Sequence, residues 1–146
     1  MALLESVMVQ TIGYVKNSLG RRPYNKWRDT ESELIINEEY QEALYRLDEF
    51  SHIEVIFYLH EVDKEFRTRI HPTGNLEYPL MGAFATRTPN RPSRIALTTC
   101  KLLSVEGNIL RVKGLDAYDG SPVLDIKPYS GKHVENLKVP QWIHRV

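Results

Sequence analysis

The sequence has little cysteine and no long hydrophobic run. Cys100 is its one cysteine, so no disulfide can form within the 146 residues. Its place in "ALTTCKLL", a strand-like stretch, predicts a small buried hydrophobe rather than a nucleophile. No apolar run approaches the roughly 20 residues that a membrane helix needs. The opening "MALLESVMVQ" has no basic region ahead of an apolar core, so we expect no secretory signal and a reducing, cytoplasmic environment.

Familiar nucleotide-binding and hydrolase motifs are also missing. The chain contains no G-x-G-x-x-G after a strand, no G-x-x-x-x-G-K-[ST] and no G-x-S-x-G. The five histidines never stand four residues apart, and no cysteine pairs with them. We therefore expect neither a phosphate-binding loop of the usual kinds nor a zinc site or other metal.

Net charge is zero, but the charges are separated along the chain. Residues 31–65 are strongly acidic, whereas residues 16–28 are basic and contain no acid. Basic side chains interleaved with aromatic ones are typical of segments that bind unpaired RNA. The candidate RNA-binding residues of this loop are Arg21, Arg22, Tyr24, Lys26, Trp27 and Arg28. A solvated loop with Trp27 packed beneath it is the alternative.

Strand-like segments dominate the rest of the chain. Strands are expected over residues 7–18, 31–37, 51–62, 95–107, 108–116 and 121–129, with "VPQWI" as a further edge. Residues 51–62 are apolar enough to be buried on both faces. Gly107-Asn108 predicts a hairpin turn.

One segment, residues 38–50, predicts a helix. Asn37 can cap it, and Tyr40, Ala43, Leu44 and Leu47 fall at helical spacing. Because strands and helices do not alternate, we predict a mainly β fold: an antiparallel β-barrel with one or two short helices. The length of 146 residues favours one domain over residues 1–146.

Two further segments have unusual chemistry. "TRTPNRPSR", residues 86–94, combines three arginines with two prolines, which stiffen the loop and keep it out of helices and inner strands. "LDAYDGSPVLDIKPY", residues 115–129, gathers aspartates around an Asp119-Gly120 turn. Such a density of carboxylates indicates either a functional site or a network of turn hydrogen bonds.

These segments resemble one known family. "GAFATRTPNRPSRIALT" followed by "LDAYDGSPVLDIKPY" is similar to the signature of the TrmO family of tRNA methyltransferases, also called YaeB or VirR-like proteins. "IGYVKNS" and "FSHIEVIFYLH" are similar to family segments in order and spacing, so the resemblance covers about residues 10–130. It implies a single-sheet β-barrel that binds S-adenosylmethionine without a Rossmann domain, and a homodimer with cofactor sites near the subunit interface. The implied reaction is N6-methylation of threonylcarbamoyladenosine beside the anticodon of certain tRNAs.

The resemblance and the residue chemistry together name a candidate site. Arg87 or Arg91 can hold the cofactor's carboxylate, since guanidinium offers a fork of donors. Either arginine can equally pair with an aspartate and join two loops. The candidate cofactor-binding residues are His52, Phe84, Arg87, Asn90, Arg91, Pro92, Leu115, Asp116, Asp119, Gly120 and Pro122.

The candidate catalytic residues are Asp125, Lys127 and Tyr129, with Asp119 as a second possible base. Asp125 can instead be a structural carboxylate satisfied by Lys127 or backbone N–H groups. Arg94 is an additional candidate for RNA phosphate.

The chain departs from the family pattern in three places. Ser93, Arg94 and Ala96 replace the family's Asn, Pro and Gly, and "LGRRPYNKWRD" stands where members carry a Pro-Arg-Gln element. The C-terminal extension of bacterial members is also missing. These departures concern the acceptor more than the cofactor. A non-catalytic module that binds S-adenosylmethionine or RNA, or an enzyme with another acceptor, is therefore the alternative function.

Overall fold

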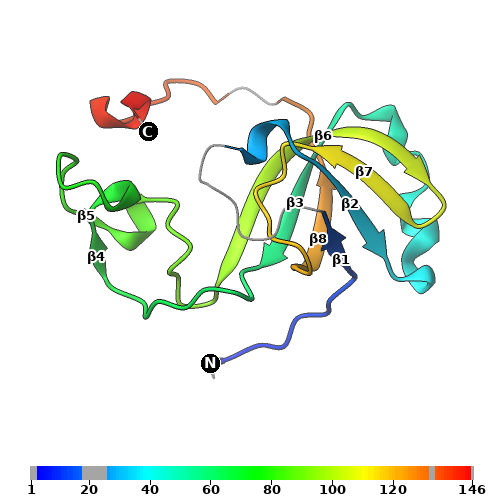
Figure 1. The fold of residues 1–146 in the computed structure, drawn as a ribbon, viewed down its shortest axis with the longest axis horizontal. Helices are drawn as coiled ribbons and strands as arrows, with labels where there is room; N and C mark the ends of the chain where they lie inside the picture. The colour runs from blue at the N-terminus through cyan, green and yellow to red at the C-terminus, as the bar shows by residue number, and fades with distance from the viewer. Residues whose placement is uncertain (1–2, 18–25, 132–133, 146) are drawn as a thin grey trace.

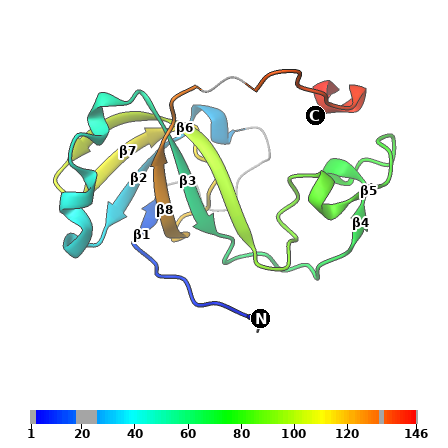
Figure 2. The ribbon, with the colours of Figure 1, turned by 180° about the vertical axis from the view of Figure 1, so that it is seen from behind.

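The fold is a closed antiparallel barrel with a small lobe beside it. It is seen in a computed structural model that describes residues 3–17, 26–131 and 134–145. The barrel order is β1-β2-β7-β6-β3-β8, and β4 and β5 form a separate two-stranded sheet. Figures 1 and 2 show the barrel on one side and the β4–β5 lobe on the other, with the C-terminal segment near the lobe. The predicted β-barrel is confirmed.

The strands and short helices have the following bounds. The strands are β1 (Gly13–Lys16), β2 (Glu31–Ile36), β3 (His52–Tyr58), β4 (Arg69–Ile70), β5 (Met81–Gly82), β6 (Ile95–Glu106), β7 (Ile109–Lys113) and β8 (Pro122–Pro128). The helices are all of the 3₁₀ type: η1 (Trp27–Asp29), η2 (Glu38–Leu44), η3 (Leu47–Glu49), η4 (Pro72–Gly74), η5 (Ala83–Ala85) and η6 (Gln141–Arg145). Among the described residues, no helix is long and apolar enough to cross a membrane.

Alternating side chains fill the barrel. In β3, Ile53, Val55 and Phe57 are buried while the residues between them are half-exposed or exposed, so this strand is buried on one face and not on both. β2 and β7 alternate in the same way. Burying each large side chain contributes about 1.5–3 kcal/mol, which makes the barrel interior the main source of stability.

Four expectations about local structure were wrong. The helix expected over residues 38–50 is two 3₁₀ helices, separated where Arg46 adopts a left-handed φ of 66°. Asn37 makes no side-chain cap; its Nδ2 donates to Thr11 O at 3.5 Å instead. The last three residues of "VPQWI", expected as an edge strand, belong to η6, and β1 begins only at Gly13. The hairpin at Gly107-Asn108 is confirmed, with Gly107 at a φ of 61°.

Cys100 lies inside the barrel, as its sequence context predicts. It is 3% exposed, and burial raises the pKa of its thiol from 9.0 to about 12. The thiolate, which is the reactive species, is therefore scarce at neutral pH.

We expect the native protein to be inert to a thiol reagent such as DTNB at pH 8, while the protein in denaturant reacts at once. The unfolded thiol loses its proton first, so stability should also decline as pH rises between about 9 and 12, compared with a Cys100→Ala variant that lacks this thiol. Rapid native labelling would contradict this assignment.

Candidate functional site

The strand ends on one side of the barrel form a rim. Tyr58 at the end of β3 pairs with Ile95 at the start of β6, and the N–H of Leu59 donates to Arg94 O at 2.8 Å. Phe57 pairs with Val123 near the start of β8. The arginine-proline loop therefore enters the barrel beside the point where the aspartate-rich turn enters β8. We call His60, Arg87, Arg94 and the turn 115–121 the rim site.

The aspartate-rich turn is held firmly against β1. The N–H of Gly120 donates to Val15 O at 2.7 Å, and the N–H of Asn17 donates to Asp119 Oδ1 at 2.9 Å. The Oγ of Ser121 donates to Tyr118 O at 2.7 Å. Gly120 has a φ of 81°, a left-handed conformation that suits glycine. One oxygen of Asp119 thus belongs to a turn network, while Asp116, Tyr118 and Gly120 are exposed at the rim.

Leu115 alternates with the exposed residues of this turn. Its side chain is fully buried in the core, so only its backbone can face a ligand. Asp116 is exposed on the same turn, and Pro122 begins β8 opposite Tyr14.

The arginines of the proline-rich loop bind backbone carbonyls. Arg91 Nη1 donates to Thr86 O at 3.0 Å, Thr88 O at 3.3 Å and Ala83 O at 3.4 Å, and its guanidinium lies 5.6 Å from the Phe84 ring centroid. Arg91 therefore organises its own loop. Arg87 Nη2 donates to Leu97 O at 3.0 Å on β6, and its side chain remains exposed. The alternative in which these two arginines pair with the aspartates is not what the structure shows.

The remaining candidates of this loop lie around Arg91. Phe84 is 75% exposed and stacks on Phe66 with ring centroids 6.3 Å apart. The N–H of Asn90 donates to Thr88 Oγ1 at 3.3 Å, and Pro92 is exposed. Phe84 thus offers an exposed aromatic face next to a guanidinium.

His52 is not at the rim. It begins β3, opposite Lys101, whereas the rim lies at the other end of this seven-residue strand. His52 and the aspartate-rich turn therefore lie at opposite ends of β3, and a role of His52 in cofactor binding stays a prediction. The Nδ1 of His52 lies 2.8 Å from Ser51 Oγ.

Two of the three candidate catalytic residues, Asp125 and Lys127, lie on the outer face of β8, and the third follows the strand. Lys127 Nζ donates to Asp125 Oδ2 at 2.9 Å, and the N–H of Ile126 donates to Asp125 Oδ1 at 2.8 Å. The hydrogen bond and charge of Asp125 raise the pKa of Lys127, which keeps this amine protonated. Tyr129 follows the strand, and its N–H donates to His52 O at 3.1 Å. The structure thus brings Asp125 to Lys127 but does not gather all three residues at the rim.

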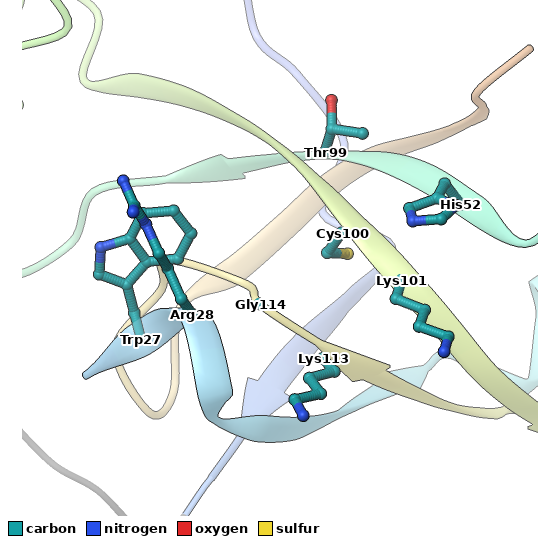
Figure 3. A pocket seen from close by; sticks show the side chains of 8 residues that line it. All are labelled: Trp27, Arg28, His52, Thr99, Cys100, Lys101, Lys113 and Gly114. Carbon is teal, nitrogen blue, oxygen red and sulfur yellow. The ribbon is translucent and has the colours of Figure 1, made fainter. Parts of the chain in front are cut away.

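The basic loop can be followed only in part. Arg21, Arg22 and Tyr24 lie outside the described residues. Lys26 is exposed, and the Arg28 guanidinium lies 5.3 Å from the centroid of the half-buried Trp27 ring. Trp27 and Arg28 line a cavity of about 410 Å³ together with His52, Thr99, Cys100, Lys101, Lys113 and Gly114 (Figure 3).

Two residues at the rim were not predicted. His60 follows β3, and within the described part of the chain its buried Nδ1 has no hydrogen-bond partner. Its Nε2 lies 3.6 Å from where a Cβ on Gly120 would stand, so the glycine leaves room beside the imidazole. Asn17 Nδ2 donates to Ala117 O at 3.1 Å and to Ser32 Oγ at 3.2 Å. The place of both residues directly after a strand was the available signal.

Comparisons with known proteins agree with this geometry. Residues 15–133 match the family model described as the tRNA-methyltransferase O N-terminal domain. An S-adenosyl-L-methionine-binding protein of Archaeoglobus fulgidus is 36% identical over 128 residues, covering 85% of this chain and 90% of that protein. A mouse tRNA (adenine(37)-N6)-methyltransferase is 38% identical over 109 residues, covering 73% of this chain and 25% of the mouse protein. The crystal structure of TrmO from Pseudomonas aeruginosa superposes with a TM-score of 0.71 at 27% identity. That alignment covers 91% of this chain and 61% of the solved one.

Proposed function

Since the chain belongs to the tRNA-methyltransferase O family, we propose that it is an S-adenosylmethionine-dependent tRNA methyltransferase. Its acceptor in this proposal is N6 of threonylcarbamoyladenosine beside the anticodon. The observation that carries the proposal is the family match over residues 15–133, because this range contains every described residue of the rim site. The mouse relative, named for adenine 37, supports the choice of acceptor position.

The rim site fits the chemistry of the cofactor. When bound, S-adenosylmethionine supplies a methyl group on a cationic sulfonium. The exposed guanidinium of Arg87 can donate to its carboxylate, and Gly120 leaves room beside the imidazole Nε2 of His60. The prolines of the Arg87 loop reduce the entropy lost on ordering. This fit rests on the residues' chemistry and supports a cofactor site at the rim.

Asp119 is the better placed of the two carboxylates for removing a proton from the acceptor. Methyl transfer needs aligned reactants and loss of the N–H proton, which is urea-like and comparatively acidic in this acceptor. Asp119 lies next to Gly120 at the rim, whereas Asp125 is held by Lys127 on the outer face of β8. Roles for Asp125, Lys127 and Tyr129 in catalysis stay predictions.

The proposal extends to assembly and location. A homodimer is supported by apolar side chains on the outer face of β3 and β6: Tyr58 is 37% exposed, Ile95 42% and Leu97 40%. We propose that residues 1–146 act as one domain in this dimer. A free buried thiol is compatible with the reducing cytoplasm.

Mass spectrometry of nucleosides provides the test. Bulk tRNA, incubated with the protein and S-adenosylmethionine carrying a labelled methyl group, is expected to yield labelled N6-methyl-threonylcarbamoyladenosine. Transcripts without the threonylcarbamoyl group are the matched control and should stay unlabelled. A methyl on another nucleoside would keep the enzyme but overturn the acceptor.

A second candidate is a module that binds S-adenosylmethionine without catalysis. It is favoured by one observation: the relative that this chain covers almost fully is named a binding protein, while the chain spans only a quarter of the mouse methyltransferase. Calorimetry separates the two. Cofactor binding with no methyl transferred to any tRNA supports the module; no cofactor binding excludes both.

A further inference from the structure

The cavity beside η1 has an unusual lining, and it is separate from the rim site. We call it the basic pocket; its residues are Trp27, Arg28, His52, Thr99, Cys100, Lys101, Lys113 and Gly114. The lining holds two lysines, an arginine and a histidine, with no acid among its residues. Figure 3 shows Trp27 and Arg28 stacked on one side and the two lysines on the other.

Lys101 and Lys113 are placed directly against each other. They are cross-strand partners in the register of β6 and β7, an arrangement that disfavours folding because like charges face each other. Neither lysine forms an ion pair within the described part of the chain. Glu31 of β2 is the cross-strand neighbour of Lys113, but its carboxylate forms an ion pair with Arg111. Among the described residues, therefore, no carboxylate pairs with either lysine, which suits an anionic ligand.

The other wall suits a flat aromatic ligand. Trp27 is half-buried, which fixes its ring, and Arg28 lies over that ring. Bases outside a duplex are bound by stacking on aromatic rings and guanidinium planes. β6 pairs with β7 only from Lys101 onward. At Thr99, therefore, β6 has no β7 partner, and the pocket opens there. An extended strand of RNA can approach there.

The pocket also adjoins the proposed chemistry. The turn that follows β7 starts at Gly114 in the basic pocket and reaches Gly120 beside His60 at the rim. Six residues span at most about 20 Å. A strand of RNA seated in the pocket can therefore reach the rim site with a nucleotide a few positions along the same strand.

We propose that the basic pocket binds an unpaired nucleotide of RNA, with its base against Trp27 and its phosphate between Lys101 and Lys113. The proposal rests on the proposed function for the identity of the RNA as tRNA. It deepens that function by assigning the residues that hold a nucleotide on the same RNA strand as the acceptor. It also gives a role to His52, which lies in this pocket instead of at the rim.

The test uses Trp27 as its own reporter. The chain has two tryptophans, so a Trp142→Phe background leaves Trp27 as the one emitter; Trp142 packs against Tyr78 and lines no part of the basic pocket. Titration with an unstructured uridine decamer is expected to quench this fluorescence. The Lys101→Ala/Lys113→Ala pair should weaken binding at least tenfold in 50 mM salt. It should also reduce the slope of log affinity against log salt by about 0.7 for each lost phosphate contact.

Matched controls separate this site from general attraction. Lys64→Ala/Lys138→Ala removes the same charge from exposed positions outside the pocket and should leave the salt slope unchanged. Removing the facing lysines should leave the melting temperature equal or higher, since like-charge repulsion is relieved. Equal weakening by both pairs, or equal quenching by polyglutamate, would overturn the proposal.

Failure of the two proposals can be told apart. If tRNA is methylated and the Lys101/Lys113 pair leaves KM for tRNA unchanged, the pocket assignment falls and the methyltransferase stands. If the decamer binds as expected but no tRNA is methylated, the pocket stands and the catalytic proposal falls.

Discussion

A Gly13→Ala protein is expected to lose at least about 3 kcal/mol of folding free energy, a large fraction of the roughly 5–15 kcal/mol that stabilises a typical domain. A Cβ at Gly13 would stand 2.2 Å from Ile35 O and 2.9 Å from Ile36 Cα. Both are backbone atoms of β2, so no side-chain rotation can relieve the clash. Gly13 also pairs with Val123, and β1 is the short strand that closes the barrel between β2 and β8. Moving β1 away from β2 would therefore open the barrel.

Chemical denaturation measures this effect. Gly82→Ala in β5 is the matched control, because the nearest atom to its added Cβ is Thr68 O at 4.0 Å and its φ of −60° suits alanine. We expect the control to stay within about 1 kcal/mol of the original protein. If Gly13→Ala unfolded at the same denaturant midpoint as the control, the register of β1 described above would be incorrect.

Arg87→Ala is expected to abolish methyl transfer while leaving the barrel folded. The proposed role of Arg87 is to hold the carboxylate of S-adenosylmethionine, and removing one partner of such a charge pair costs about 2 kcal/mol or more. That corresponds to a loss in cofactor affinity of about 30-fold or more. The hydrogen bond lost from Leu97 O lies at an exposed position where water can replace it, so the melting temperature should change little.

Calorimetric titration with S-adenosylmethionine checks this prediction, with methyl transfer as the second measurement. Arg87→Lys keeps the charge but not the planar fork, and it should recover only part of the affinity. Arg67→Ala, at an exposed arginine of the segment between β3 and β4, is the matched control and should bind like the original protein. Unchanged affinity in Arg87→Ala would remove this arginine from the cofactor site.

The rim site shows why some residues could be predicted and others could not. Arg87 and the Asp119-Gly120 turn were identified because their composition is unusual for loops. His60 was missed since its sequence context, the end of an apolar strand, is ordinary. Its significance comes from Gly120, sixty positions away in the chain, where an added Cβ would stand 3.6 Å from its Nε2. A strand pattern does not say which of its ends a distant turn will reach, so the sequence could not show that His52 and Gly120 lie at opposite ends of β3.

The helix expected over residues 38–50 makes a similar point. The spacing of its apolar residues correctly predicted which side chains face the core, since Leu44 is buried and Tyr40 and Leu47 pack against it. The hydrogen-bond pattern is nevertheless 3₁₀, and Arg46 interrupts it with a left-handed φ. Packing on a curved barrel determined the local backbone more strongly than helix propensity did.

By itself the sequence determined the β-barrel class, most strand positions, the buried inert thiol and the chemistry of the rim loops. These properties depend on alternation, turn residues and composition, all of which act between near neighbours in the chain. Only the tertiary structure decided that Arg91 serves its own loop, that His60 adjoins Gly120, and that Lys101 faces Lys113 beside Trp27. Such proximities depend on strand register and barrel closure, which join segments far apart in sequence and leave no local pattern to read.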